Sequence, residues 1–198
     1  HIVVCGWNAT ARELVNELAT DEYEAKVVVV HQADKNPAGK DVYFVNGDPT
    51  ELADLQRAGI EDAMAAIICP ADASNDADMR SILTVMAIET TAPRVRTVVE
   101  VNNPAHRDHF ERAGADEIVV SSSLTSRLLA RSSLYPGLAG VVTNIVSGGE
   151  GSELYRVALP PSYIGLSLDD LAAKMRTDHK AVLLGVNRDG VSHLNPEG

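Results

Sequence analysis

Apolar and amphipathic stretches alternate along the first 120 residues of the chain. Short apolar runs, such as the four consecutive valines within 26–31, are typical of strands buried on both faces of a parallel sheet. We predict such strands over 2–5, 26–31, 42–45, 65–69, 95–101 and 118–120. Helical spacing of apolar residues predicts the intervening helices over 9–18, 49–58, 74–90 and 104–112. The alternation predicts an α/β fold in residues 1–120, a Rossmann-like doubly wound parallel sheet of six strands.

Two further amphipathic helices are predicted over 124–134 and 138–146, after the last strand of this sheet. No later strand follows for them to cross to, so their apolar faces need another surface. We expect residues 121–147 to form a crossover helix-turn-helix that pairs two copies of the chain, with Leu138 and Val142 facing the partner.

A small α+β lobe, residues 152–198, follows a glycine-rich linker at 147–151. Within it we predict a strand over 154–159, a helix opened by Ser167 with Asp170 as its capping partner, and a strand over 181–186 that turns into a hairpin at 187–190. The lobe stops unfinished at Gly198, and the chain starts abruptly in a strand at His1. We therefore expect a truncated lobe and a fragment of a longer protein.

Composition narrows the function classes. Aromatic residues make up only 4% of a chain that is 45% hydrophobic, so the core must be aliphatic, and no apolar run of about 18 residues exists to span a membrane. The net charge is −11, and residues 1–120 account for all of it with 21 acidic and 10 basic residues. Such a surface excludes nucleic acid as an expected partner. The two cysteines, Cys5 and Cys69, fit a reducing compartment, and we interpret them as small buried side chains rather than a redox pair.

The first strand-to-helix turn, Gly6-Trp7-Asn8-Ala9-Thr10-Ala11, carries part of a dinucleotide-binding fingerprint. Gly6 fits, and Ala11 is tolerated at the third glycine position. Asn8 replaces the glycine that lets the backbone approach a pyrophosphate, although asparagine accepts left-handed angles and the turn should survive. His31-Gln32 stands where an acid would bind ribose hydroxyls. The turn is therefore either a vestige or a weak nucleotide site.

A second group of motifs carries a family resemblance. Gly47-Asp48-Pro49-Thr50, the segment Ala113-Gly114-Ala115-Asp116 and the helix pair at 124–146 occur in an order that resembles the RCK (regulator of K⁺ conductance) family, of TrkA-N and TrkA-C type. The Gly6-Trp7 pair is similar to that of prokaryotic ligand-gated potassium channels rather than of separate transporter-regulating subunits.

The resemblance implies a ligand-sensing domain on the cytoplasmic face of the cell membrane. It would form a homodimer through residues 124–146, then an octameric gating ring beneath a potassium-channel pore carried by the same full-length chain. Its ligand would be an adenine nucleotide (NAD, ADP or ATP) or Ca²⁺. The nucleotide cleft would be lined by the following residues: Gly6, Trp7, Asn8, Ala9, Thr10, His31, Gln32, Asp48, Cys69 and Pro70.

The resemblance also places a calcium site at the ends of the fourth and fifth strands. The corresponding positions here are Cys69, Glu100 and Asn102, and only Glu100 is a carboxylate. Because Ca²⁺ takes six to eight oxygen ligands with several charges, we expect a nucleotide in preference to calcium.

Two alternative functions are a regulatory subunit of a potassium uptake transporter and an NAD(P)-dependent oxidoreductase. The tail after Gly151 is too small and apolar to supply a substrate domain, and no nucleophile, base and orienter stand at a recognisable spacing, so we expect no enzyme. Asp72, Asp76 and Asp78 are interpreted as acids that favour a helix dipole. His106 and His109 are too few for a metal site.

Overall fold

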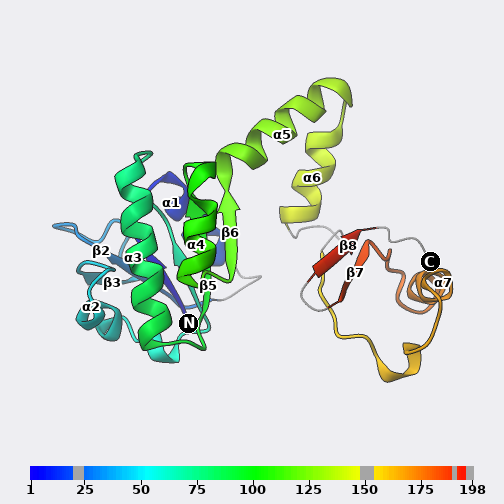
Figure 1. The fold of residues 1–198 in the computed structure, drawn as a ribbon, viewed down its shortest axis with the longest axis horizontal. Helices are drawn as coiled ribbons and strands as arrows, with labels where there is room; N and C mark the ends of the chain where they lie inside the picture. The colour runs from blue at the N-terminus through cyan, green and yellow to red at the C-terminus, as the bar shows by residue number, and fades with distance from the viewer. Residues whose placement is uncertain (20–24, 148–153, 189–190, 195–198) are drawn as a thin grey trace. The chain divides into compact units, whose positions relative to one another are not determined.

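Six parallel strands form the sheet that organises the first part of the chain. The computed structural model describes residues 1–19, 25–147, 154–188 and 191–194. The strands are β1 (Ile2–Cys5), β2 (Val27–His31), β3 (Tyr43–Asn46), β4 (Ala65–Ile68), β5 (Arg96–Val101) and β6 (Glu117–Val120). Their order is β3-β2-β1-β4-β5-β6, and every pairing is parallel (Figure 1). The predicted doubly wound sheet is confirmed.

Helices cover both faces of this sheet because successive strand residues point to opposite sides. The helices are α1 (Ala9–Leu18), α2 (Leu52–Arg57), α3 (Asn75–Thr91) and α4 (Arg107–Ala113), with 3₁₀ turns η1 (Ile60–Asp62) and η2 (Pro104–His106). Ile2 and Val4 pack with α1, whereas Val3 and Cys5 pack into a larger core with α2, α3 and α4. Both cores are almost wholly aliphatic, as the composition predicts.

Gly6 closes the first turn at a point where no side chain fits. Its φ is 88°, and a Cβ placed there would lie 2.1 Å from the carbonyl oxygen of Cys69. The ends of β1 and β4 approach each other closely because they are neighbours in the sheet. The structure therefore requires this glycine whether or not a ligand binds.

Asp78 holds the connection between β5 and α4. Its carboxylate is fully buried in the first turn of α3. It accepts hydrogen bonds from the backbone N–H groups of Asn102 and Asn103, each at 3.0 Å, and its Oδ2 lies 2.8 Å from Nδ1 of His106. Asp78 lies in the first turn of α3, as the helix-dipole interpretation expects, and its hydrogen bonds to residues outside α3 add a second role.

Two helices follow β6, as predicted. They are α5 (Ser121–Leu134), which begins three residues earlier than expected, and α6 (Leu138–Ser147). Contacts divide the chain into two compact units, His1–Val141 and Val142–Gly198. None of the helices in the described parts of the chain is long and apolar enough to cross a membrane.

The second unit contains η3 (Pro161–Tyr163), α7 (Leu168–His179) and the antiparallel pair β7 (Gly185–Arg188) and β8 (Val191–Leu194). Ser167 caps α7 by accepting from the N–H of Asp170 at 3.1 Å, which confirms that motif. The hairpin is also confirmed, but its first strand lies later than 181–186, and residues 189–190 of its turn are outside the described residues.

The predicted strand over Leu154–Leu159 is wrong, because these residues have no regular structure and are exposed. Apolar alternation alone does not make a strand; a neighbouring strand must satisfy its backbone groups, and no described strand pairs with this segment. Most of the predicted linker, at 148–151, lies outside the described residues.

Replacing Asp78 with Asn should destabilise the fold by about 2–4 kcal/mol. The variant keeps the shape of the side chain, but its amide NH₂ meets donors where a carboxylate oxygen accepted them. Asp76→Asn is the matched control, since Asp76 lies in the same helical turn and is exposed. Urea unfolding monitored by circular dichroism measures both. Equal midpoints for the two variants would contradict the assigned role of Asp78.

Candidate functional site

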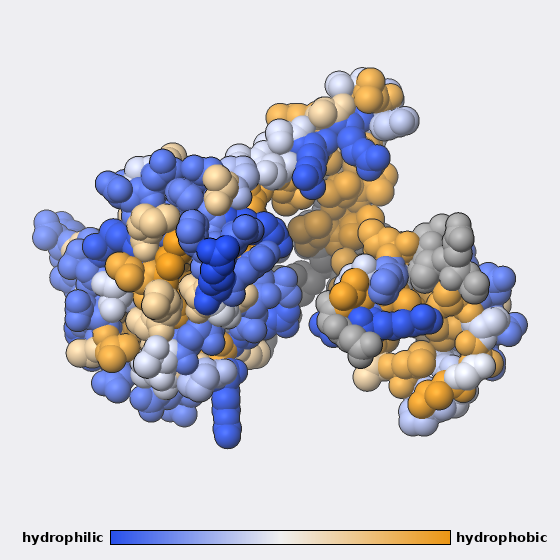
Figure 2. Space-filling view, viewed as in Figure 1, coloured by the Kyte–Doolittle hydropathy of each residue, from blue (hydrophilic) through white to orange (hydrophobic). Residues whose placement is uncertain are grey.

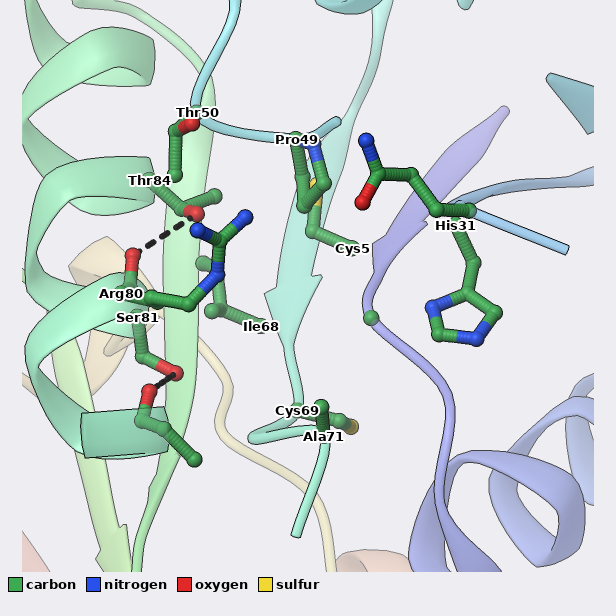
Figure 3. A pocket seen from close by; sticks show the side chains of 13 residues that line it. Cys5, His31, Pro49, Thr50, Ile68, Cys69, Ala71, Arg80, Ser81 and Thr84 are labelled. Carbon is green, nitrogen blue, oxygen red and sulfur yellow. Dashed lines mark hydrogen bonds between the residues drawn. The ribbon is translucent and has the colours of Figure 1, made fainter. Parts of the chain in front are cut away.

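A cavity lies at the carboxyl ends of the central strands, where parallel α/β sheets bind ligands. Its volume is about 160 Å³. Gly6 and Cys5 border it from β1, Cys69 follows β4, and Arg80 reaches it from α3 (Figure 3). The remaining lining residues are His31, Gln32, Pro49, Thr50, Ile68, Ala71, Ala77, Ser81 and Thr84.

Four of the ten residues predicted for the cleft line this cavity: Gly6, His31, Gln32 and Cys69. The other six lie outside the lining: Trp7, Asn8, Ala9, Thr10, Asp48 and Pro70. The sequence prediction missed the contribution of α3, from which Arg80, Ser81 and Thr84 face the cavity. The spacing of the polar positions 80, 81 and 84, which places them on one side of a helix, is the signal that would have indicated it.

Asn8 caps α1 and does not use the left-handed conformation that asparagine tolerates. Its backbone is extended, with φ −149°, and its Oδ1 accepts from the N–H of Ala11 at 2.8 Å. Its Nδ2 donates to the carbonyl of Pro70 at 2.9 Å and to Oε2 of Glu100 at 3.0 Å. Asn8 therefore uses part of the donor capacity that the helix start would offer to a phosphate.

Glu100 lies at this helix start and is held there by three donors. Besides Asn8, Oε1 accepts from the hydroxyls of Thr10 at 2.9 Å and Ser121 at 2.8 Å. The N-terminus of a helix favours negative charge. Glu100 thus supplies an anion from within the protein and links the first turn to the first residue of α5.

The resemblance places a calcium site at Cys69, Glu100 and Asn102, and the structure gives these side chains other surroundings. Burial, aided by the charge of Glu100, raises the pKa of the Cys69 thiol to about 12. The Asn102 amide donates to the carbonyl of Asp72 at 2.8 Å. Among the described residues, no three His, Cys, Asp or Glu side chains gather as metal ligands.

Asp48 and Arg80 form an ion pair beside the cavity, which Arg80 lines. Nη2 of Arg80 lies 2.7 Å from Oδ2 of Asp48, while Oδ1 accepts from the backbone N–H and the hydroxyl of Thr50 at 3.0 and 2.8 Å. Burial pushes the pKa of Asp48 up, but the hydrogen bonds from Thr50 and Arg80 and the charge of Arg80 outweigh it and hold the pKa below its ordinary value. Both oxygens of the carboxylate are therefore occupied.

Arg80 is the one cationic side chain among the lining residues, because His31 is neutral. Burial lowers the pKa of His31 below its ordinary value of 6.5, so the ring is neutral at pH 7. The guanidinium of Arg80 points into the cavity in Figure 3, with its charge balanced by Asp48. The cavity thus offers hydrogen-bonding groups and little net charge.

Comparison with known proteins places the chain in a family. Residues 2–121 match the model of the TrkA-N domain. The chain belongs to this family. It is 28% identical over 181 residues to the calcium-gated potassium channel TvoK of Thermoplasma volcanium, covering 88% of the chain and 52% of that protein. The chain therefore spans about half the length of this relative.

Three solved structures share the fold. The human SLO3 gating ring superposes with a TM-score of 0.74 at 17% identity, covering 99% of the chain and 41% of the ring chain. The GsuK RCK domain gives 0.59 at 20% identity, with 99% and 40% covered. The Kef C-terminal domain of Shewanella denitrificans, in AMP-bound form, gives 0.52 at 15% identity, with 70% and 84% covered.

Both cysteines should resist thiol reagents in the folded protein. Burial raises the pKa of Cys5, like that of Cys69, to about 12. At pH 8 such a thiol is roughly one part in ten thousand thiolate, against roughly a quarter for an unperturbed cysteine. The folded protein should react with dithionitrobenzoate about a thousandfold more slowly than the protein unfolded in guanidinium chloride. Rapid reaction of either thiol in the native state would contradict the assignment of both as structural side chains.

Proposed function

We propose that this chain is the ligand-sensing regulatory domain of a potassium channel and has no catalytic role. The observation that carries the proposal is the extent of the similarity to a calcium-gated potassium channel, which covers 88% of the chain. The likeness in fold to a gating ring, over 99% of the chain, supports the same reading. The domain would lie on the cytoplasmic face of the membrane, with the pore in the same full-length protein.

An adenine nucleotide is the ligand we favour. The cleft keeps the glycine turn, the helix start and a carboxylate at Asp48 near its mouth. The calcium alternative would have to compete with three hydrogen-bond donors for its one carboxylate, Glu100. Because Asn8 crowds the helix start, we expect micromolar or weaker affinity, worth about 8 kcal/mol or less.

Glu100 offers a route from the cleft to the dimer helices. Its carboxylate bonds Asn8 and Thr10 at the first turn and Ser121 at the start of α5. A phosphate that takes the donors of Asn8 or Thr10 would release Glu100 and with it Ser121. Ligand binding and the direction of α5 would then be coupled, as allostery requires of two distinct sites.

The partner surface is the exposed apolar side of α5 and α6. Large apolar side chains here include Leu124, Leu129, Leu134, Val141 and Val146, each more than half exposed. Figure 2 shows apolar surface over α6. Apolar patches of this kind mark protein interfaces, so we propose a dimer through 124–146 and, by assembly of dimers, an octameric ring.

A second candidate is a regulatory subunit of a potassium transporter. The observation that favours it is the likeness in fold to an AMP-bound Kef C-terminal domain, which covers 70% of the chain. The sequence that precedes this chain in its gene separates the two: pore helices with a selectivity-filter loop would indicate the channel.

Titration calorimetry with NAD, ADP, ATP and Ca²⁺ tests the ligand, and K⁺ flux through the full-length protein in liposomes tests the function. We expect a nucleotide to bind at micromolar or weaker affinity and to change the flux at the same concentration. Ser121→Ala should leave binding in place and reduce the flux response, because it removes the link between Glu100 and α5.

Glu100→Gln separates the two ligands. Nucleotide heat should persist in this variant, since Asn8 still caps α1. Calcium heat abolished by Glu100→Gln, with no nucleotide heat in either protein, would overturn the ranking of ligands. A full-length protein without K⁺ conductance under any ligand would contradict the channel assignment.

Replacing Leu134 and Val141 with Asp should give monomers in analytical ultracentrifugation. Both are well exposed in the isolated chain, whereas the Leu138 and Val142 pair expected from the sequence is half-buried, so the exposed pair disturbs the helices less. Thr125→Asp with Thr143→Asp adds the same charge to the same helices without removing apolar surface. A stable dimer of the Leu134/Val141 variant would refute this interface.

A further inference from the structure

The cavity is small for the ligand that the proposed function assigns to it. Its volume of about 160 Å³ falls below the 300–1,000 Å³ typical of small-molecule pockets. Arg80 lines it, while Asp48, which bonds Arg80, does not. The guanidinium therefore borders the cavity while it is bonded to a carboxylate outside the lining.

The partners of Asp48 differ in how easily they can leave. Thr50 binds Oδ1 twice from two residues away in the same turn, so its bonds are local. Arg80 reaches Oδ2 from α3, 32 residues away in sequence, on a side chain that is 56% exposed. Holding the long, solvent-exposed Arg80 side chain in one geometry costs side-chain entropy. Arg80 is the partner that a ligand can displace, whereas Thr50 would keep the carboxylate in place.

We propose, resting on the proposed nucleotide site, that the Arg80–Asp48 ion pair is a latch that limits access to the cleft. Closed, it occupies the carboxylate oxygen that would accept a hydrogen bond from the exocyclic amino group of an adenine. Open, it frees Oδ2 for that amino group and enlarges the cavity. Arg80 is thus a specificity-determining residue: it sets the affinity for amino-bearing purines without contacting them in the bound state.

A different role for Arg80 makes the opposite prediction. As the one cationic side chain lining the cavity, it would bind a phosphate of the ligand directly. Removing it would then weaken ADP and leave adenosine, which has no phosphate, unchanged. The latch requires instead that both ligands bind more tightly, by the same factor.

The test is calorimetry of the purified protein and its Arg80→Gln variant with adenosine, ADP and purine riboside, which lacks the amino group. The single tryptophan, Trp7, follows Gly6 and gives a second readout by fluorescence. We expect Arg80→Gln to bind adenosine and ADP about tenfold more tightly, a change of about 1.4 kcal/mol. Purine riboside should gain much less, because it has no amino group to place on Asp48.

Arg96→Gln is the control. Arg96 pairs with Glu117 at 2.6 Å, and its side chain is 56% exposed, as that of Arg80 is. Arg96 does not line the cavity, so its loss should leave every affinity unchanged. Adding Asp48→Asn to Arg80→Gln should cancel the gain for adenosine. Thermal unfolding confirms that each variant is folded.

The outcomes distinguish a failure of the latch from a failure of the proposed nucleotide site. Wild-type protein that binds ADP while Arg80→Gln binds it equally well or more weakly overturns the latch and leaves the nucleotide site standing. No binding by either protein overturns both. Tighter binding by Arg80→Gln that Arg96→Gln reproduces would also overturn the latch, because the effect would then come from net charge.

Discussion

The meeting of strand ends at one edge of the parallel sheet is the constraint on which the rest of the site depends. Because β1, β4 and β5 are parallel neighbours, their carboxyl ends bring Gly6, Cys69 and Glu100 to the start of α1. The backbone there is so close that only glycine fits beside Cys69. An anion at this helix start is favourable, and the chain provides its own in Glu100.

Several polar side chains around this cleft are already hydrogen-bonded to other groups of the protein. At one end, Asn8 caps the helix and, with Thr10, binds Glu100. At the other, Arg80 binds Asp48. The side chains of Asn8, Thr10 and Asp48 thus already have partners within the protein. Ligand binding therefore means exchange of partners, which lowers affinity and at the same time gives each ligand contact a conformational consequence.

That exchange suits a sensor better than a tight cofactor site. A permanently bound cofactor would report nothing, whereas a ligand that competes with internal bonds shifts a balance between two arrangements. In the proposed function, the Glu100 contact to Ser121 would carry such a change to α5, whose large apolar side chains are exposed.

The sequence by itself determined the order and type of the elements in residues 1–120. The valine run of β2 and the helical spacing in α1 and α3 are local signals that burial in a parallel sheet enforces. Gly6 and the Ser167 cap were also readable, because each acts on its own turn. Local patterning failed at Leu154–Leu159, where alternation had no neighbouring strand to pair with.

Only the tertiary structure decided which polar groups are free to meet a ligand. Asn8 looked like an obstacle at the glycine turn, but its amide donates to Pro70 and Glu100. Asp48 looked like a lining residue until Arg80, from another helix, was seen to cover it. Asp78 looked like a helix-dipole acid until Asn102, Asn103 and His106 were seen to surround it. In each case the partner lies more than twenty residues away, and hydrogen bonding depends on distance in space, which periodicity along the chain does not encode.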